Sequence, residues 1–268
     1  MISAKNDGYF NLIVSSGCAG SFNMSADLSL LNKYKMISDF SSRPTLRIYY
    51  FDPPALSLGF FQKDKNIDEG IIAKAKNKGY DIVSRPTGGR AVLHKSEITY
   101  SIAASYKEGI FAGKLLETYK KVGKFIYMFF INLGLSPDNE VSLKVNEKSN
   151  VASKRGNGFN CFLKTHSYEI TFDGKKICGN SQRRNESAFL QHGSIYVDYN
   201  PAEHLELFEG GSFNSDYFNN ITGIKQEMRK TGIHFGLYTL SFGHLSDIMV
   251  KSFRDTYNLK PKHAVMPI

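Results

Sequence analysis

Short segments rich in β-branched and aromatic residues recur along the chain, and many of them alternate between apolar and polar positions. This pattern predicts β-strands. The segments are 9–15, 45–51, 55–60, 80–84, 97–104, 167–172, 175–178 and 187–198, the last being one strand or a strand pair. The dipeptide Asp173-Gly174 stands between two of them and is typical of a tight hairpin turn.

Longer segments repeat their apolar residues every three to four positions, which predicts amphipathic helices. These segments are 22–37, 66–78, 113–133, 200–208 and 243–256. The helix at 113–133 carries an apolar stripe that we expect to face the core: Leu115, Leu116, Tyr119, Val122, Phe125, Ile126, Phe129 and Phe130. Gly79 and Gly134 are suited to end the helices that precede them. The polar stretch 138–158 is interpreted as an irregular connection.

Strands and helices alternate without an internal repeat, which favours the α+β class. We expect a mixed β-sheet with flanking helices, packed on one side of the sheet. A chain of 268 residues suits one large domain. We therefore expect a single domain over 1–268, with a helical C-terminal segment at about 200–268.

The composition excludes several classes of protein. Hydrophobic residues make up 41 % and aromatic residues 13 % of the chain, which suffices for a packed core. No apolar run approaches the roughly 20 residues of a membrane-spanning helix. The N-terminal segment MISAKNDGYF lacks the apolar stretch of a signal peptide. We therefore expect a cytoplasmic protein that does not bind membranes.

The three cysteines are Cys18, Cys161 and Cys178. This small, odd number argues against a framework of disulfides. None of them forms a CxxC pair, so a zinc site would need widely separated ligands. We expect no metal site.

The charge balance is basic: 34 Lys and Arg against 25 Asp and Glu give a net charge of +9. The positive charges are scattered along the chain, so a solvated surface without a partner is the simplest interpretation. Docking to an acidic protein comes next, and nucleic-acid binding comes last because no aromatic-basic module is visible.

The segment RPTGGRAVLH at 85–94 lies between two predicted strands and is neither a dinucleotide fingerprint nor a Walker A loop. Its adjacent glycines permit positive φ angles and a close approach of another group to the backbone. Arg85, Arg90 and His94 supply hydrogen-bond donors beside them, and Thr87 can bond locally. Taken alone, the glycine pair favours a tight turn between strands with incidental charges.

The neighbouring residues extend this segment into a family resemblance. RPTGGRAVLHKSEITYSI at 85–102 resembles the signature of the lipoate–protein ligase and octanoyltransferase family, whose fold is shared with biotin protein ligases. Further segments resemble family motifs in the same order: SFNMSADLSLL at 21–31, PTLRIYYFDPPALSLGFFQ at 44–62, FDGKKICGNSQRR at 172–184 and LQHGSIYVD at 190–198. The resemblance covers about 9–200 and implies one catalytic acyltransferase domain with a biotin/lipoate protein ligase-like fold.

The resemblance also implies site residues. In the family, the glycine-rich loop and the following strand wrap the acyl chain and its carbonyl end. The implied substrate-binding residues are Arg85, Thr87, Gly88, Gly89, Arg90, His94, Gly179 and His192. The family's essential lysine lies in a G-[RK]-K-[IV]-x-G pattern, which here runs from Gly174 to Gly179 and makes Lys176 the match. A lysine ammonium close to a thioester carbonyl can hydrogen-bond the developing oxyanion.

The family divides on mechanism. Its ligases activate lipoate with ATP, whereas one transferase branch moves octanoate through a cysteine in a context like A-C-F-x-x-P-S-x-Y-E. Here 160–169 read NCFLKTHSYE, so Cys161 is the match, and His166 replaces the usual proline. The thiolate is the attacking species, and nearby positive charge from Lys176, or from Lys164 or His166, would lower its pKa. Cys18 and Cys178 are expected to pack in the core, although Cys178 lies beside the lysine and a minor redox role stays open.

Two features favour the transferase branch over the ligases. Arg90 stands where ligases often have a third glycine, and an RPTGGR form resembles the transferases. About 70 residues follow position 198, which is short for the accessory domain that many ligases carry. Some ligases have that domain on a separate chain, so this second feature is suggestive only.

The sequence therefore favours an octanoyltransferase that moves octanoyl from acyl carrier protein, through a Cys161 thioester, to a lysine of a lipoyl domain or glycine-cleavage H protein. The alternatives are an ATP-dependent lipoate–protein ligase, a protein-to-protein lipoyl or octanoyl amidotransferase, and a non-catalytic basic module that binds a lipoyl domain or nucleic acid. We expect no cofactor, since only the ligase would need ATP and Mg. We also expect no nucleic-acid partner and a monomer. Octanoate and lipoate are not separated, because both are eight-carbon acids.

Overall fold

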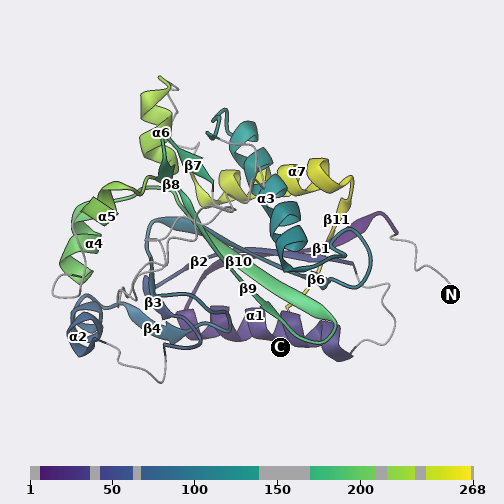
Figure 1. Ribbon diagram of the computed structural model, residues 1–268, viewed down its shortest axis with the longest axis horizontal. Coiled ribbons are helices and arrows are strands. Elements are labelled where there is room, and N and C mark those ends of the chain that lie inside the picture. Colours follow the sequence, from purple (N-terminus) through teal and green to yellow (C-terminus); the bar gives the residue numbers. More distant parts are fainter. Residues whose placement is uncertain are drawn as a thin grey trace, which may run out of the picture.

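The computed structural model describes residues 7–36, 43–62, 68–138, 170–208, 216–232 and 240–266. In this part of the chain, the main element is a six-stranded sheet with the order β11-β1-β2-β6-β10-β9 (Figure 1). Its strands are β1 (Tyr9–Cys18), β2 (Thr45–Phe51), β6 (Glu97–Ser105), β9 (Cys178–Arg184), β10 (Ala188–Tyr196) and β11 (Lys260–His263). β1 is parallel to β2 and β11, whereas the β2–β6, β6–β10 and β10–β9 pairs are antiparallel. The expected mixed sheet is thus confirmed.

A smaller sheet lies beside the main one and carries the glycine-rich segment. Its order is β4-β3-β5, with β3 (Ala55–Leu58), β4 (Asp81–Ser84) and β5 (Val92–His94). The loop 85–91 connects β4 to β5. A short hairpin of β7 (Thr171–Phe172) and β8 (Lys175–Lys176) turns at the predicted Asp173-Gly174. Both turn residues have positive φ, and the Asp138 carboxylate accepts hydrogen bonds from both of their N–H groups.

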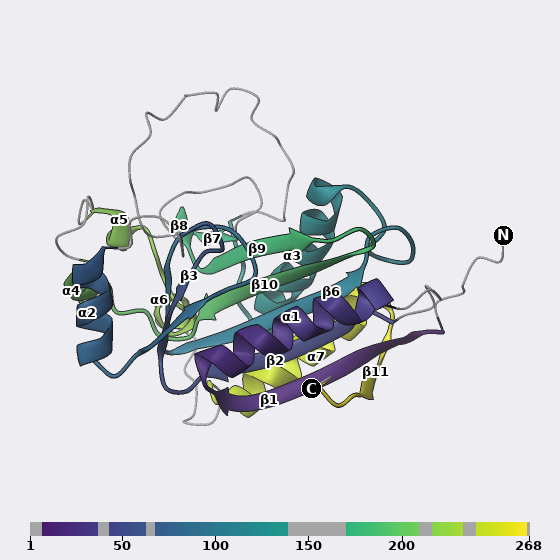
Figure 2. The same cartoon turned by 90° about the horizontal axis from the view of Figure 1, so that it is seen from below.

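Helices cover both faces of the main sheet, which corrects the expectation of helices on one side (Figure 2). Helix α1 (Gly20–Met36) lies on one face, and α3 (Leu115–Asn132) and α7 (Phe242–Tyr257) pack together on the other. The physical reason is visible in β6 and β10, in which all nine residues of each strand are buried. A strand buried on both faces requires a covering layer on each side.

The remaining described helices are α2 (Glu69–Asn77), α4 (Pro201–Phe208), α5 (Asp216–Asn219) and α6 (Ile224–Lys230). Helix α2 contacts β4 and α4, and residues of α2, α4 and α5 close a second apolar core with the small sheet. The Asp68 carboxylate caps α2 by accepting from the N–H groups of Gly70 and Ile71. This second core holds the small sheet, and with it the glycine-rich loop, in place.

The principal core is built from aromatic side chains between the main sheet and α3–α7. Val122, Phe125, Ile126, Phe129 and Phe130 are fully buried, as predicted for the stripe of α3. Leu115, Leu116 and Tyr119 are the exceptions: the two leucines, in the first turn of α3, have 45 % and 47 % of their surfaces exposed, and Tyr119 is half-buried. Within the described residues, no helix is long and apolar enough to cross a bilayer.

The predicted elements differ from the observed ones mainly in polar stretches. The predicted 45–51 strand is confirmed at both ends, and α2 and α3 end just before Gly79 and Gly134, whose φ angles are +73° and +79°. The segment 178–184 forms strand β9, which its polar sequence CGNSQRR did not indicate. The C-terminal segment is not purely helical, since β11 joins the sheet edge beside β1. The irregular connection predicted at 138–158 lies outside the described residues from 139 onward. The first three residues of the predicted strand 167–172 also lie outside them.

Candidate active site

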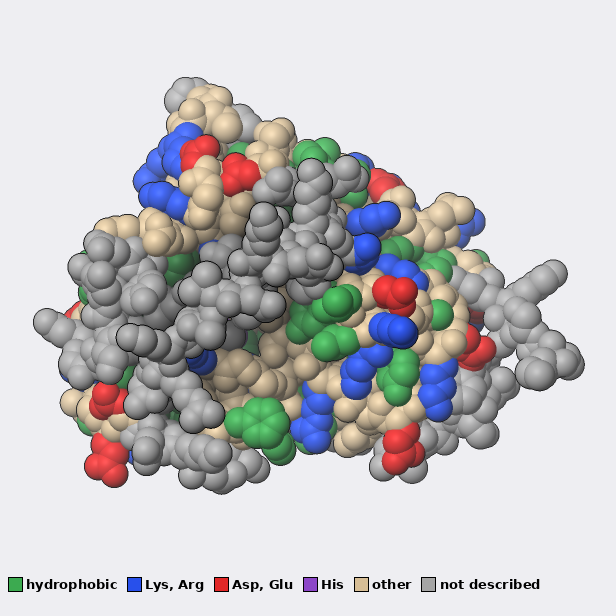
Figure 3. All heavy atoms as spheres, in the orientation of Figure 1, with side chains coloured by type: hydrophobic (Ala, Val, Ile, Leu, Met, Phe, Trp, Pro, Cys, Tyr) green, Lys and Arg blue, Asp and Glu red, His purple; other side chains and the backbone are tan. Residues whose placement is uncertain are grey.

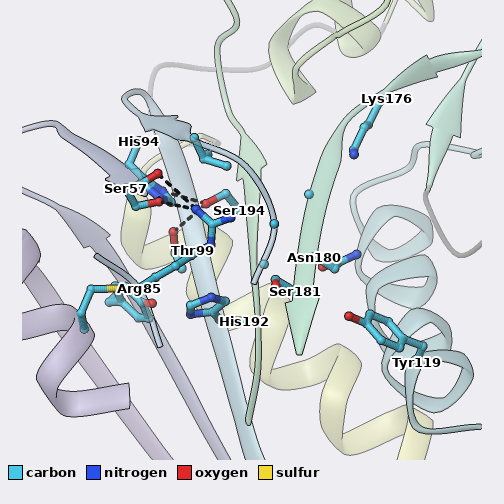
Figure 4. A pocket seen from close by; sticks show the side chains of 16 residues that line it. Ser57, Arg85, His94, Thr99, Tyr119, Lys176, Asn180, Ser181, His192 and Ser194 are labelled. Carbon is cyan, nitrogen blue, oxygen red and sulfur yellow. Dashed lines mark hydrogen bonds between the residues drawn. The ribbon is translucent and has the colours of Figure 1, made fainter. Parts of the chain in front are cut away.

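A cavity of about 240 Å³ lies between the main sheet, the small sheet and the glycine-rich loop (Figure 4). Helices α1 and α3 and strand β8 each contribute one side chain to it: Met24, Tyr119 and Lys176. The rest of its lining comes from the two sheets and the loop: Tyr49, Ser57, Arg85, Gly89, Val92, His94, Thr99, Gly179, Asn180, Ser181, His192, Gly193 and Ser194. Five of the substrate-binding residues implied by the family resemblance, Arg85, Gly89, His94, Gly179 and His192, thus meet Lys176 around one space, although they are far apart in the sequence.

The glycine-rich loop is held in place by the Arg85 side chain. Its guanidinium donates to the backbone carbonyls of Ser57, Gly88 and Arg90 and to the Ser57 hydroxyl, at 2.6 to 3.1 Å. Arg85 is accordingly almost fully buried. Because these bonds end on the protein itself, Arg85 braces the loop.

Glycine is needed where the loop meets β3. Gly89 has a φ of +94°, a conformation that residues with a side chain rarely adopt. Its carbonyl oxygen would lie only 1.9 Å from a Cβ atom placed on Gly59, so position 59 has no room for a side chain. The Ser181 hydroxyl donates to the Gly88 carbonyl at 2.9 Å and joins the loop to β9. The adjacent glycines therefore let the loop lie close against both sheets.

A buried polar network connects the loop to the interior. His192 Nδ1 donates to Asp27 at 3.0 Å, so Nε2 of the neutral ring accepts from the Thr87 hydroxyl at 2.6 Å. The Asp27 carboxylate is also bonded by Arg47 at 3.0 Å and by Tyr49 at 2.8 Å. Thr87 does not line the cavity but fixes His192, which does.

The electrostatics of this network follow from burial. Burial is the largest influence on the Asp27 carboxyl and would raise its pKa, but the hydrogen bond from His192 and the charge of Arg47 outweigh it and keep the pKa below its usual value. Burial lowers the pKa of His192 despite the opposing effect of Asp27. The pair is therefore a carboxylate and a neutral imidazole near neutral pH.

A second histidine forms a polar cluster at the side of the cavity away from Lys176 (Figure 4). His94 Nδ1 lies 3.2 Å from a Glu97 carboxylate oxygen and 2.9 Å from the Ser194 hydroxyl, and Nε2 lies 2.8 Å from the Ser57 hydroxyl. Its ring also stacks on Phe51, with 4.1 Å between the ring centroids. His94 is thus fixed on both ring edges and on one ring face.

Lys176 is the cationic side chain on the opposite side of the cavity, and its ammonium group points inward in Figure 4. Only 4 % of the residue is exposed. Its backbone N–H donates to the Asn220 carbonyl, and its own carbonyl accepts from Thr222 N–H. The tight hairpin turn and this pairing position a buried positive charge where it can hydrogen-bond an oxygen of a bound molecule. Within the described residues, no group of three or more His, Cys, Asp and Glu side chains could hold a metal ion.

Residues 19–251 match the model of the lipoyl protein ligase A/B catalytic domain. The chain belongs to this family.

Curated members similar to the chain are octanoyltransferases LipM. The LipM of Geobacillus kaustophilus is 36 % identical over 201 residues, which are 75 % of this chain and 69 % of the relative. The LipM of Brevibacillus brevis is 37 % identical over 186 residues, 69 % of this chain and 65 % of the relative. The matched part thus spans about two thirds of each relative.

Solved structures agree on the fold. Lipoate-protein ligase A bound with ATP has a TM-score of 0.68 at 16 % identity, covering 96 % of this chain and 90 % of that one. A bipartite lipoate protein ligase from Thermoplasma acidophilum, solved in a study that included its E2 lipoyl domain, has a TM-score of 0.63 at 14 % identity, covering 96 % and 88 %. At such identities the likeness concerns the fold alone.

The structure places the described residues that the family resemblance implied in or beside one cavity. Arg85, Gly89, His94, Lys176, Gly179 and His192 line it. Gly88 and Arg90 do not line the cavity but belong to the same loop, and their carbonyl oxygens accept hydrogen bonds from Arg85. Cys161, Lys164 and His166 lie outside the described residues, so the predicted nucleophile stays a prediction. Cys178 is buried in the principal core, as expected, whereas Cys18 is only half-buried.

Several residues of the site were not predicted, both in the cavity lining and in the buried network behind it, and two kinds of sequence signal could have indicated them. Polar residues occupy alternate positions in β6 and β10, on one face of otherwise apolar strands, and the unpredicted Thr99 and Ser194 are among them. This period of two marks a polar wall inside the protein. Asp27 is a charged residue on the covered side of α1, where it is fully buried. A buried charge requires partners, so its position pointed to the network with His192.

Proposed function

We propose that this protein is an octanoyltransferase of protein lipoylation that takes octanoyl from acyl carrier protein and forms a thioester on Cys161. The octanoyl group then passes to a lysine of a lipoyl domain or glycine-cleavage H protein. The family membership and the similarity to LipM octanoyltransferases support the reaction class. The acyl donor, the cysteine intermediate and the identity of the acceptor are the finer parts of the proposal.

The chemistry needs no ATP, because the donor is already a thioester. The Cys161 thiolate attacks the carbonyl carbon, a new carbon–sulfur bond forms, and the carrier leaves as a thiol after taking up a proton. The acceptor amine then attacks the enzyme thioester, an amide forms, and the bond to Cys161 breaks. The amine proton goes to the departing sulfur or to solvent. Both steps pass through an oxyanion, which the Lys176 ammonium would stabilise.

The placement of Lys176 is the observation that carries the proposal. Its buried ammonium faces a cavity of about 240 Å³. An engineered cavity of about 150 Å³ in another protein takes up benzene, so the nine heavy atoms of an octanoyl group need on the order of 225 Å³. The cavity therefore suits an eight-carbon chain with its carbonyl beside Lys176.

The surface charge supports acidic protein partners. On the face shown in Figure 3, Lys and Arg side chains gather over the region of α3. Lys120 and Lys124 of this helix are exposed, as is its N-cap residue Lys114, and Tyr119 of the same helix lines the cavity. Positive potential around the entrance would steer acidic carriers and acceptors toward it.

Intact-protein mass spectrometry after incubation with octanoyl–acyl carrier protein tests the proposal. We expect the protein to gain the mass of one octanoyl group without ATP, and Cys161→Ala to abolish this gain. Cys18→Ala is the matched control and should retain the adduct, because Cys18 lies in β1. An unchanged adduct in Cys161→Ala would remove Cys161 from the mechanism. ATP-dependent modification of a lipoyl domain with free lipoate, unaffected by Cys161→Ala, would instead indicate a ligase.

A further inference from the structure

A second cavity, of about 450 Å³, lies against the first one. Met24 and Arg85 line both cavities and form the partition between them. Beyond this partition the second cavity runs along α1 and β4, with Leu28, Phe60, Ile82, Val83 and Pro86 as its apolar lining. Leu28 is 37 % exposed, so this cavity reaches the surface. The second cavity, on the far side of Met24, can therefore accept the end of an apolar acyl chain.

The partition closes the end of the first cavity that lies opposite Lys176. Figure 4 shows Arg85 and Lys176 on opposite sides of this cavity. An acyl group with its carbonyl at Lys176 consequently extends toward Met24 and Arg85. Its terminal methyl group meets the partition when the chain fills the available length.

The two residues of the partition differ in their freedom to move. The guanidinium of Arg85 is fixed by bonds to Ser57 and to the loop carbonyls. Met24 packs in an apolar cluster with Tyr49, Phe51 and Ala55. A thioether side chain is unbranched and makes no obligatory hydrogen bond, so its length alone determines how far it fills this gap.

We propose that Met24 sets the acyl chain length that the enzyme accepts, by separating the eight-carbon space from the second cavity. This inference rests on the proposed function, since it takes the carbonyl to lie at Lys176. A smaller residue at position 24 joins the two cavities and admits longer chains. A bulkier residue shortens the first cavity.

Binding of free fatty acids, measured by calorimetry, tests the inference without requiring catalysis. We expect the unaltered protein to bind octanoic acid and to bind dodecanoic acid at least tenfold more weakly. Met24→Ala should reverse this order, because each additional buried methylene strengthens binding about fourfold. Met24→Phe should shift the preference to hexanoic acid. This opposite change keeps the test valid if Met24→Ala does not fold, which a thermal melting curve would reveal.

Two control variants distinguish a specific effect on acyl-chain length from a general loss of packing around the cavities. Met24→Leu conserves the volume and should keep the octanoic preference. Leu28→Ala changes a residue that lines only the second cavity, and it should also keep that preference. Unchanged chain-length preference in both Met24→Ala and Met24→Phe would overturn the inference while leaving the octanoyltransferase proposal standing. Failure of the unaltered protein to bind octanoic acid would instead contradict the proposed function itself.

Discussion

Lys175 and Lys176 are adjacent in β8, so their side chains point to opposite sides of the strand. Lys176 is buried at the cavity, whereas Lys175 is only half-buried. We expect Lys176→Met to lower the rate of octanoyl transfer to a lipoyl domain by about 10²- to 10³-fold, the usual loss for one oxyanion donor. The rate is measured by following the octanoylated lipoyl domain over time.

Lys175→Met is the matched control, since it removes the same charge one position away. We expect it to retain transfer within a few fold. Equal losses in the two variants would mean that the hairpin needs positive charge in general, and that Lys176 has no specific contact with the reacting carbonyl.

Site residues that belong to a sequence motif could be predicted. Roles that depend on tertiary contacts could not. Lys176 and Arg85 were located by the family resemblance, and both line the cavity. Arg85 was expected to bind substrate, but its guanidinium instead donates to carbonyl groups of the loop. That role depends on how a loop folds back on its own side chain, which no local pattern encodes. The importance of Met24 likewise depends on two cavities that meet only in three dimensions.

At the scale of the elements, α4 is attached to β10 of the main sheet through a buried histidine. His204 Nδ1 donates to the Asn200 carbonyl at 3.1 Å, and Nε2 lies 3.0 Å from the Tyr196 hydroxyl. The rings of Tyr199 and Phe218 pack around it. Burial lowers the pKa of His204 from 6.5 to about 4, although the bond to the Asn200 carbonyl opposes this shift. The neutral ring is thus part of the folded structure.

This pKa predicts a loss of stability in acid. The folded pKa lies below the unfolded one, so the unfolded chain binds more protons between pH 6.5 and about 4. The contribution is complete above pH 6.5 and disappears as the pH falls toward 4, on the order of 3 kcal/mol in total. We expect urea unfolding at pH 7.5, 6 and 5 to show this decline, and His204→Phe to reduce it. Part of the decline should remain in that variant, because the pKa of His192 is lowered in the same direction.

The same substitution at the exposed His244 of α7 controls for the loss of an imidazole. An identical pH dependence in His204→Phe and the unaltered protein would show that α4 does not depend on a neutral His204.

Elements with strong apolar periodicity were predictable, and those defined by pairing were not. The stripe Val122 to Phe130 was sufficient to locate α3, since a continuous apolar face has to meet a core. Strand β9 has a polar sequence because it is the sheet edge and borders the cavity, so its hydrogen bonds to β10 define it. The position of helices on both faces likewise required the burial pattern of β6 and β10, which short apolar runs do not reveal.

At the scale of the whole molecule, the net charge of +9 predicts a dependence on ionic strength. Opposite charges on enzyme and carrier accelerate their encounter, and salt screens this attraction with a Debye length of about 10 Å at 0.1 M. We expect kcat/KM with octanoyl–acyl carrier protein to fall about tenfold between 0.05 and 0.5 M salt, which is the lower end of the rate gains that electrostatic steering gives. The rate with a small uncharged octanoyl thioester should stay constant.

The small thioester also serves as the control for effects of salt on the fold. A parallel fall for both donors would indicate that salt acts on the enzyme itself. A constant rate for both would show that the surface charge is a solvated layer without a role in partner encounter, which was the simplest interpretation of the composition.

The pairing of β1 with β11 has a consequence for the synthesis of the protein. β1 leaves the ribosome about 250 residues before its partner at Lys260–His263. At a synthesis rate of about 5 to 20 residues per second, the N–H and C=O groups on one edge of β1 remain unpaired for on the order of 10 to 50 seconds. A nascent chain with such an open edge can recruit a strand from elsewhere. We therefore expect the unfinished polypeptide to depend on chaperones more than its compact final form would suggest.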